Sequence, residues 1–331
     1  MSTLAPMLEA FFTDRLQQQR HASPNTIAAY RDTFRLLLTF ARDDIGDAPS
    51  DLALAQLDAP FILRFLAHLE KQRRNSVSTR NARLAAVHSF FRYVALREPA
   101  HAGMIQRVLA IPHKRAGKKL VAFLTRPEFE AILAAPDQTT SLGRRDYALL
   151  LVAIQTGLRV SELIALTIED VRLDHGAAHV RCRGKGRKER VTPLTVQSVK
   201  ALRAYLRDRP NVTQTSVLFL SRRDGPLSRD AIEHLVEVHR QRAAKKCPTL
   251  ANKNVSPHVL RHTSAMLLLQ AGTDRSTIAL WLGHESIETT EIYLHADLAT
   301  KERAIAKTAP PRTRQARYHP SDPILGFLQS L

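Results

Sequence analysis

The chain has 331 residues, of which 44% are hydrophobic and 24% are charged. This balance excludes a disordered or fibrous protein, and the length is sufficient for about two domains. The formal net charge is +18, which favours a polyanionic partner, because a basic surface gains affinity by releasing counterions from phosphates. The alternative is that the charge serves only to keep the protein soluble, in which case it indicates no partner. Nucleic acid is therefore the expected ligand.

The same composition sets expectations for location and redox state. No stretch approaches the roughly 20 apolar residues of a membrane span, and the first 20 residues lack the layout of a secretory signal. A cytoplasmic protein with no membrane partner is therefore expected. The only two cysteines, Cys182 and Cys247, are too few for a disulfide framework and form no C-x-x-C pair, so we expect ordinary reduced thiols.

Residues 1–98 are predicted to form a helical domain. In "SPNTIAAYRDTFRLLLTFAR", Ser23 is placed as an N-cap and Pro24 as the first helical residue. Apolar residues then recur at steps of three and four, which makes one stripe: Ile27, Tyr30, Phe34, Leu37 and Ala41. Two further stripes run through residues 59–72 and 78–96. Short polar connections between them are typical of a small helical bundle.

Residues 99–120 are predicted to be a linker. The stretch contains Pro, Gly and a basic cluster without a sustained apolar period. The charge of the chain also changes here, since residues 1–98 carry a net +3 and residues 99–331 carry the remaining +15. A positively charged linker would suit a chain that passes along a phosphate backbone.

Residues 121–305 are predicted to form a second domain of the α+β type. It opens with a capping box, in which Glu128 follows Thr125 by three residues. A long apolar helical run over residues 144–166 is interrupted at Gly157. Residues 177–194 change period and flank a basic glycine-containing turn, which predicts a β-hairpin. Helical patterns resume near Leu227 and continue to about Ala304. The basic tail, residues 306–331, ends in a short apolar segment expected to be helical.

Four stretches of the second domain concentrate reactive side chains: "TGLRVSEL", "GKGRKER", "SPHVLRHTSA" and "LGHESIETTEIYLH". The basic turn fails the phosphate-loop pattern, because no strand and helix flank it in the required order. His258 and His262 have the spacing of a zinc pair, with His284 as a third candidate, but Arg261 between them would repel the metal. No cluster of Asp and Glu is present to hold metal ions. Arg, Lys, His and Tyr together are suited to stabilising a phosphate without a metal or another cofactor.

In chain order these motifs resemble the six-residue signature of the tyrosine recombinases, the family of phage integrases and Xer-type recombinases. The positions that match are Arg159, Lys185, His258, Arg261, His284 and, nine residues later, Tyr293. The motifs cover residues 156–295, and the helical region 1–98 resembles the SAM-like core-binding domain of that family. The resemblance implies a mainly helical protein, with a helical DNA-binding domain and a catalytic domain that carries a small β-hairpin or sheet.

The resemblance also implies an activity, the cutting and rejoining of DNA through a 3′-phosphotyrosine without metal or ATP. Tyr293 would be the nucleophile, Arg159 and Arg261 would grip the phosphate, and Lys185 would protonate the leaving oxygen. His258 would act in proton transfer and His284 would bind the phosphate. Outside this set, the resemblance implies that Glu162 orients the site, while His262, His295 and Tyr318 are expected to have supporting or structural roles.

The implied partners are double-stranded DNA and further copies of the chain, assembled as a synaptic homotetramer, with related recombinases as further candidate subunits. Residues 320–331 are the candidate segment for docking onto a neighbouring protomer. Two alternatives stay open: a DNA-relaxing enzyme of the type IB topoisomerase kind, and a catalytically silent DNA-binding regulator. The basic tail favours a mobile element, with transposition or integration as its context, over a chromosomal role.

Overall fold

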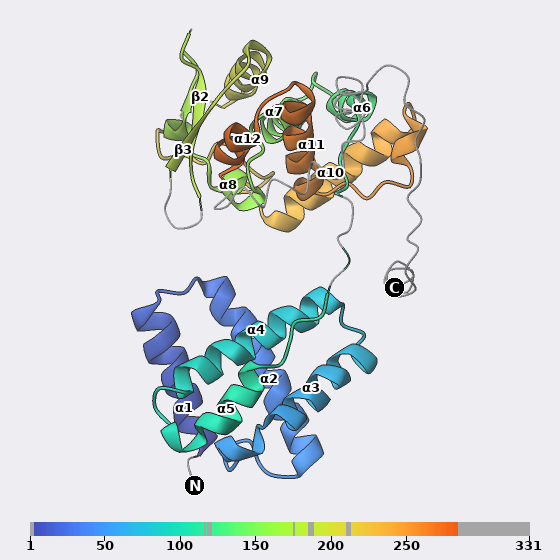
Figure 1. The fold of residues 1–331 in the computed structure, drawn as a ribbon. Helices are drawn as coiled ribbons and strands as arrows, with labels where there is room; N and C mark the ends of the chain where they lie inside the picture. The colour runs from blue at the N-terminus through green and yellow to red at the C-terminus, as the bar shows by residue number, and fades with distance from the viewer. Residues whose placement is uncertain are drawn as a thin grey trace, which may run out of the picture. The chain divides into compact units, whose positions relative to one another are not determined.

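The computed structural model describes residues 3–115, 117, 121–174, 176–184, 189–209 and 213–283. The chain divides into two compact units, residues 1–118 and 119–331. Both units are built mainly from helices, and the only sheet among the described residues lies in the second unit (Figure 1). The predicted fold class, mainly helical with a small sheet, is confirmed.

The first unit consists of five α-helices joined by short connections. They are α1 Leu4–Ala10, α2 Pro24–Ile45, α3 Ala59–Lys71, α4 Val77–Val94 and α5 Ala102–Leu109. A π-helical stretch, Phe11–Gln19, continues α1. Two 3₁₀ turns, Leu54–Gln56 and Pro99–His101, precede α3 and α5. Together these elements enclose one hydrophobic core.

Helix α2 begins and packs as its sequence predicts. The Ser23 hydroxyl accepts a hydrogen bond from the Thr26 amide, so one of the unpaired N–H groups at the helix start is satisfied. The predicted apolar stripe faces the core, with Phe34, Leu37 and Ala41 buried. The Phe34 ring contacts other aromatic rings of the core edge to face, a geometry that aromatic pairs prefer.

The segment expected to be a linker differs from that expectation over its first half. Residues 102–109 form α5, and the side chains of Ile105, Val108 and Ile111 lie in the core of the first unit. The chain that follows is fastened to α4, because the Asn81 side-chain amide donates to the Lys114 carbonyl and accepts from the Lys114 amide. Met104 and Leu109 of α5 pack against the same core while partly exposed, but the helix has only eight residues, which is too short to produce a sustained apolar period in the sequence.

Within the described residues the second unit has seven α-helices, six of which lie around the buried helix α7. They are α6 Arg126–Leu133, α7 Ser141–Thr156, α8 Val160–Ala165, α9 Val196–Leu206, α10 Arg229–Ala244, α11 Pro257–Gln270 and α12 Arg275–Leu282. Short 3₁₀ turns lie at Ile168–Asp170 and Pro248–Leu250. The predicted capping box at the start of α6 is present, since Glu128 accepts a hydrogen bond from the Thr125 amide.

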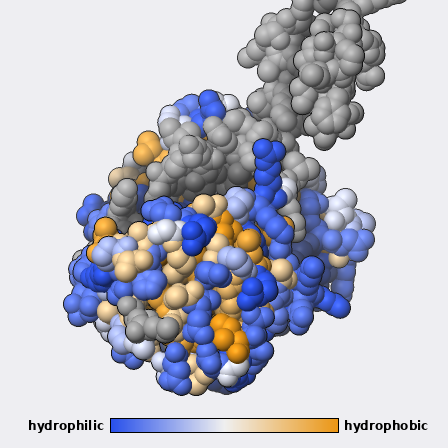
Figure 2. Space-filling view, turned by 60° about the horizontal axis from the view of Figure 1, so that its bottom comes forward, coloured by the Kyte–Doolittle hydropathy of each residue, from blue (hydrophilic) through white to orange (hydrophobic). Residues whose placement is uncertain are grey.

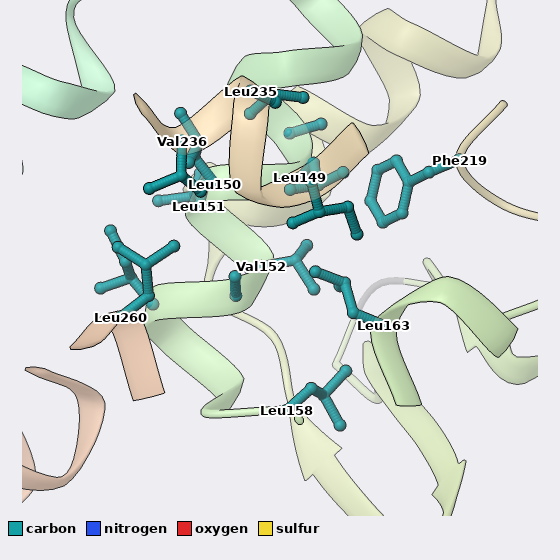
Figure 3. Packing of buried hydrophobic residues seen from close by; sticks show 14 of the residues in the cluster. Leu149, Leu150, Leu151, Val152, Leu158, Leu163, Phe219, Leu235, Val236 and Leu260 are labelled. Carbon is teal, nitrogen blue, oxygen red and sulfur yellow. The ribbon is translucent and has the colours of Figure 1, made fainter. Parts of the chain in front are cut away.

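Helix α7 forms the centre of the second core. Residues 148–154 are all buried, so this helix is apolar on every side, as expected of a helix that others surround. Figure 3 shows Leu149 to Val152 packed among Leu235 and Val236 of α10, Leu260 of α11 and Leu163 of α8. Because α7 is held on all sides, the position of its C-terminal end is fixed for the site described below.

The small sheet has three antiparallel strands in the order β1-β2-β3. They are β1 Val171–Arg172, β2 His179–Arg183 and β3 Glu189–Pro193. Strands β2 and β3 form the predicted hairpin, with Cys182 opposite Arg190 and Arg183 opposite Glu189. Both cysteines are free, and burial raises the pKa of the Cys182 thiol to about 11.

The described surface exposes few large apolar side chains. They are Leu63, Leu96, Val191, Val196 and Leu280. On the face that Figure 2 shows, hydrophilic residues predominate and the strongly hydrophobic ones form small separate areas. No helix within the described residues is both long enough and apolar enough to cross a lipid bilayer.

Candidate active site

Arg159 lies in the sharp turn between α7 and α8. Gly157 ends α7 with φ = +61°, a left-handed conformation that L side chains rarely adopt. Arg159 is the N-cap of α8, and its amide donates to the Glu162 carboxylate at 2.7 Å. Its guanidinium donates to the same carboxylate through Nη1 at 2.9 Å, and its side chain stays 31% exposed. Arg159 therefore has one face held by the protein and another open to solvent.

Arg261 projects from α11 to the same place and is almost fully buried. Its Nη1 donates to the Gly157 carbonyl at 2.6 Å, and its Nη2 donates to the Leu282 carbonyl at 2.8 Å. These carbonyls belong to the C-terminal ends of α7 and α12, where unpaired acceptors and a partial negative charge favour a cation. One buried guanidinium thus joins two helix ends that are far apart in the sequence.

The turn at the end of α12 completes this arrangement. Gly283 adopts φ = +65°, and its carbonyl accepts a hydrogen bond from Arg159 Nη2 at 3.0 Å. The packing leaves no room for side chains at either glycine. A Cβ on Gly157 would lie 2.5 Å from Leu282 Cδ2, and one on Gly283 would lie 2.7 Å from Arg190 Nη1. The two glycine turns let the backbone approach closely enough to place both arginines.

Arg190 is a member of the site that sequence reasoning did not single out. It lies on β3, and its guanidinium donates to both Glu162 oxygens, at 3.0 Å through Nη1 and 2.6 Å through Nη2. A signal for its burial was present, since Arg190 and Thr192 alternate with the exposed Glu189, Val191 and Pro193. Nothing in the local sequence indicated the partner, which lies 28 residues upstream.

Positive charge exceeds negative charge in this cluster. Among the described residues, Glu162 is the one carboxylate that contacts Arg159 and Arg190, while Arg261 donates to main-chain carbonyls. Burial by itself would raise the pKa of Glu162, but hydrogen bonds from Arg190 and Arg159 and the charge of Arg190 outweigh it, so this pKa is lowered. Glu162 is therefore ionised at neutral pH. The cluster as a whole is suited to an anion.

The histidines of α11 lie beside the arginines and are expected to be neutral at pH 7. The rings of His258 and His262 lie with their centroids 6.2 Å apart. The pKa of His258 is lowered, first by burial and then by nearby positive charges, Arg261 foremost. Burial also lowers the pKa of His262, to about 4, with His258 and Arg261 adding to the effect. A neutral imidazole beside the arginines can accept a proton.

The structure brings together four of the seven side chains expected at the site. Arg159 and Glu162 are in direct contact, Arg261 meets them through the two glycine turns, and the charges of both arginines affect His258. Lys185, His284 and Tyr293 lie outside the described residues, as do Tyr318 and His295. Within the described residues, no three His, Cys, Asp or Glu side chains are grouped to hold a metal ion.

Chemically, this part of the site is built to bind a tetrahedral or trigonal oxyanion. A guanidinium matches two oxygens of a phosphate at once, and it carries its charge at every accessible pH. Arg159 and Arg261 are held in place before any ligand arrives, so binding needs little rearrangement of the protein. Preorganised donors of this kind stabilise charge that develops in a transition state. Fold and site together define a two-unit, mainly helical protein with an arginine cluster suited to an anion such as phosphate.

Comparison with known proteins identifies the family. The sequence profile described as "Phage integrase family" matches residues 122–299, and "Phage integrase, N-terminal SAM-like domain" matches residues 10–98. A Sinorhizobium fredii protein described as an integrase/recombinase is 53% identical over 330 residues, which cover 100% of this chain and 99% of that protein. The chain belongs to the phage integrase family, whose members are tyrosine recombinases.

A further relative agrees with this assignment, and a solved structure shares the fold. The tyrosine recombinase XerC of Pelobacter propionicus is 34% identical over 297 residues, which cover 89% of this chain and 93% of XerC. Among solved structures, the XerH recombinase bound to its palindromic difH substrate superposes with a TM-score of 0.69 at 24% identity, covering 87% of this chain and 81% of XerH. The predicted family and enzyme class are confirmed, and the topoisomerase-like and regulatory alternatives gain no support.

Proposed function

We propose that this chain cuts and rejoins double-stranded DNA at specific sites through a covalent 3′-phosphotyrosine. The observation that carries the proposal is the pair of arginines, Arg159 and Arg261, which two glycine turns hold beside a neutral histidine. The relatives support it through their names as recombinases and integrases, and XerH was captured with DNA bound. DNA is thus the partner that the positive charge of the chain fits.

In the cleavage step, Tyr293 Oη attacks the scissile phosphorus and the P–O5′ bond breaks. The phenolic proton passes to a base, for which His258 is the candidate because its lowered pKa keeps the imidazole neutral. Lys185 gives a proton to the departing oxygen, so the products are a 3′-phosphotyrosine and a free 5′-hydroxyl. Arg159, Arg261 and His284 stabilise the added charge on the non-bridging oxygens.

The rejoining step is the reverse reaction with another strand. A 5′-hydroxyl from the partner duplex attacks the phosphotyrosine and gives its proton to Lys185, the P–Oη bond breaks, and Tyr293 recovers its proton from His258. The phosphotyrosine retains the energy of the original phosphodiester, so neither ATP nor a metal ion is required. In each step one phosphoester bond is made and one is broken, one proton leaves the attacking hydroxyl and one is given to the departing oxygen.

The parts of the chain divide the work in this proposal. Residues 1–98 and the linker up to residue 120 would hold the duplex mainly through phosphate contacts, which position a protein without specifying a sequence. Residues 121–305 carry the chemistry. Recombination joins four strands, so the active assembly is a homotetramer on two duplexes, and residues 306–331 contribute its protomer contacts. A mobile element is the proposed context, and the cytoplasm the proposed location.

A covalent adduct tests the proposal directly. The full chain is incubated with genomic DNA of its source cells and denatured, and fragments that stay bound to protein are captured and sequenced to locate the site. A duplex nicked next to that site then traps the cleaved state. We expect the adduct to be abolished by Tyr293→Phe and retained by Tyr318→Phe.

An adduct that persists in Tyr293→Phe would refute the assignment of the nucleophile. Absence of any adduct with the unmodified chain would refute the proposed activity. A plasmid carrying two copies of the site distinguishes recombination, which changes the order of the DNA between them, from relaxation, which changes supercoiling alone.

A further inference from the structure

Arg190 holds the carboxylate on which Arg159 depends. Glu162 accepts four hydrogen bonds, of which two come from Arg190 and two from Arg159. A carboxylate has about four acceptor sites, so this one is fully used. Because both arginines share the same two oxygens, a shift of Arg190 moves the anchor of Arg159.

Arg190 also forms one wall of the turn that receives Arg159. The guanidinium and Cδ of Arg190 pack against Gly283 so closely that a Cβ there would lie 2.7 Å from Nη1 and 3.3 Å from Cδ. The Gly283 carbonyl, in turn, accepts from Arg159 Nη2. Glu162 and Gly283, the hydrogen-bonding partners of the Arg159 side chain within the described residues, are therefore both in contact with Arg190.

Arg190 and Arg159 differ in the exposure of their side chains. The Arg190 side chain is 11% exposed and that of Glu162 is 4% exposed, while Arg159 is 31% exposed. Arg190 thus lies behind the carboxylate, whereas Arg159 presents its free face to solvent. This order, with a buried arginine behind a carboxylate that holds a partly exposed arginine, is typical of groups that orient a ligand-binding residue.

Another ion pair of the same unit, with a buried arginine and a carboxylate that is 40% exposed, provides a contrast. Arg240 of α10 donates to both oxygens of Glu237 at 2.7 and 2.6 Å and to the Leu250 carbonyl at 2.6 Å. Its side chain is 12% exposed, which matches Arg190. Arg240 lies 11 residues after Arg229, the helix start whose charge affects His258, or about 16 Å further along α10. Its geometry and burial resemble those of Arg190, but its partners lie outside the arginine cluster.

We infer that Arg190 is a positioning residue of the active site. Because it hydrogen-bonds to Glu162 and packs against the Gly283 turn, it orients the guanidinium of Arg159 toward the scissile phosphate. The inference rests on the proposed function, because it presupposes that Arg159 binds that phosphate. A residue of the hairpin that carries Lys185 thus joins the groups that hold the Arg159 side chain. An arginine held this way reaches the phosphate without the loss of side-chain freedom that binding otherwise costs.

The test compares Arg190→Gln and Arg190→Lys with the matched control Arg240→Gln in the full chain. The nicked duplex found by adduct mapping serves as substrate, and three quantities are measured: the fraction folded, the dissociation constant for DNA, and the single-turnover rate of adduct formation. For Arg190→Gln we expect the rate to fall roughly 100-fold, as for loss of a preorganised donor, with DNA affinity within about threefold of wild type. Arg190→Lys should recover part of the rate, and Arg240→Gln should cut normally.

Two readouts separate positioning from loss of structure. If Arg190 acts through Arg159, the variant Arg159→Ala/Arg190→Gln should cut no more slowly than Arg159→Ala alone. The second readout uses a duplex with a neutral methylphosphonate at the scissile position. This substrate lacks the oxygen charge that Arg159 neutralises, so the defects of Arg190→Gln and Arg159→Ala should both shrink on it, whereas a folding defect would be equal on both substrates.

The inference is overturned if Arg190→Gln cuts at the wild-type rate, if the two losses multiply in the double variant, or if the defect is the same on the methylphosphonate. The unmodified chain and Tyr293→Phe are run beside every variant. No adduct from the unmodified chain would overturn the proposed function and this inference together, whereas an active wild type with an unaffected Arg190→Gln would overturn the inference alone.

Discussion

Glu162 is the residue on which the arginine cluster depends for both stability and geometry. Its carboxylate is almost fully buried and meets Arg159 and Arg190. Removing one partner from a buried ion pair leaves an uncompensated charge, which costs about 3–5 kcal/mol. Glu162→Gln should therefore lower the free energy of unfolding by that amount in urea titrations at pH 7. The control Glu237→Gln removes a carboxylate that is 40% exposed and should cost no more than about 1 kcal/mol.

At acid pH, the free energies of unfolding of the wild type and of Glu162→Gln should differ by less than they do at pH 7. The pKa of Glu162 is lowered in the folded protein, so the unfolded chain binds its proton first as the pH falls below the ordinary value of 4.5. The contribution of the carboxylate is thus complete above that pH and is lost as the pH drops toward the folded pKa. Unfolding titrations at pH 7 and pH 4 measure this. An equal difference in the free energy of unfolding at both pH values would contradict the assignment of an ionised carboxylate to Glu162.

At the scale of elements, the ends of α7 and α12 position the site. Gly157 and Gly46 both end a helix in the left-handed conformation, but a Cβ on Gly157 would lie 2.5 Å from Leu282 Cδ2, while one on Gly46 would meet nothing within 4 Å. Gly46→Ala should cost about 1–2 kcal/mol from backbone strain. Gly157→Ala should cost about 1–3 kcal/mol more from overpacking.

The loss in Gly157→Ala should extend to activity, because the Gly157 carbonyl holds Arg261. Melting curves and adduct yields of the two variants, compared with each other, check both effects. Equal stability of the two alanine variants would show that the close approach of α7 and α12 does not constrain the site.

These elements also show what the sequence could and could not predict. The start of α2 at Pro24 and the break at Gly157 were predictable, because caps and glycine stops are local signals. Helix α5 was missed, since its Ile105 and Val108 gain their role only from the core they enter. The contact between Arg190 and Glu162 was equally hidden, because pairing between a strand and a helix start depends on the fold and leaves no local pattern.

For the whole molecule, charge and chemistry are distributed unevenly. The net charge of residues 119–331, the second unit with its tail, is +11, against +7 for residues 1–118, so the larger share of the electrostatic attraction for DNA comes from the unit that carries the candidate active site and from the tail. Binding driven by phosphate contacts weakens with salt, with a logarithmic slope of about −0.9 per contact. On a duplex with a single site, the salt slope therefore counts the phosphate contacts of one protomer and does not depend on contacts between protomers.

Removal of the last twelve residues can therefore separate assembly of protomers from binding of DNA by one protomer. Residues 320–331 contain five large apolar side chains and no Lys or Arg, and the arginines of the tail, Arg312, Arg314 and Arg317, all precede them. A chain that ends at residue 319 should bind one site with unchanged affinity and salt slope, because it keeps every basic residue. If the removed segment docks onto a neighbouring protomer, cooperative binding to paired sites and recombination should fall at least tenfold.

Gel-shift titrations on one-site and two-site duplexes measure both quantities, with Leu325→Ser/Phe327→Ser as a full-length control that removes the apolar contact alone. The control should behave as the truncation does, because docking by burial of apolar surface depends on those side chains. Undiminished recombination by the truncated chain would contradict docking by this segment and would leave DNA and the catalytic unit as the contacts that hold the proposed tetramer together.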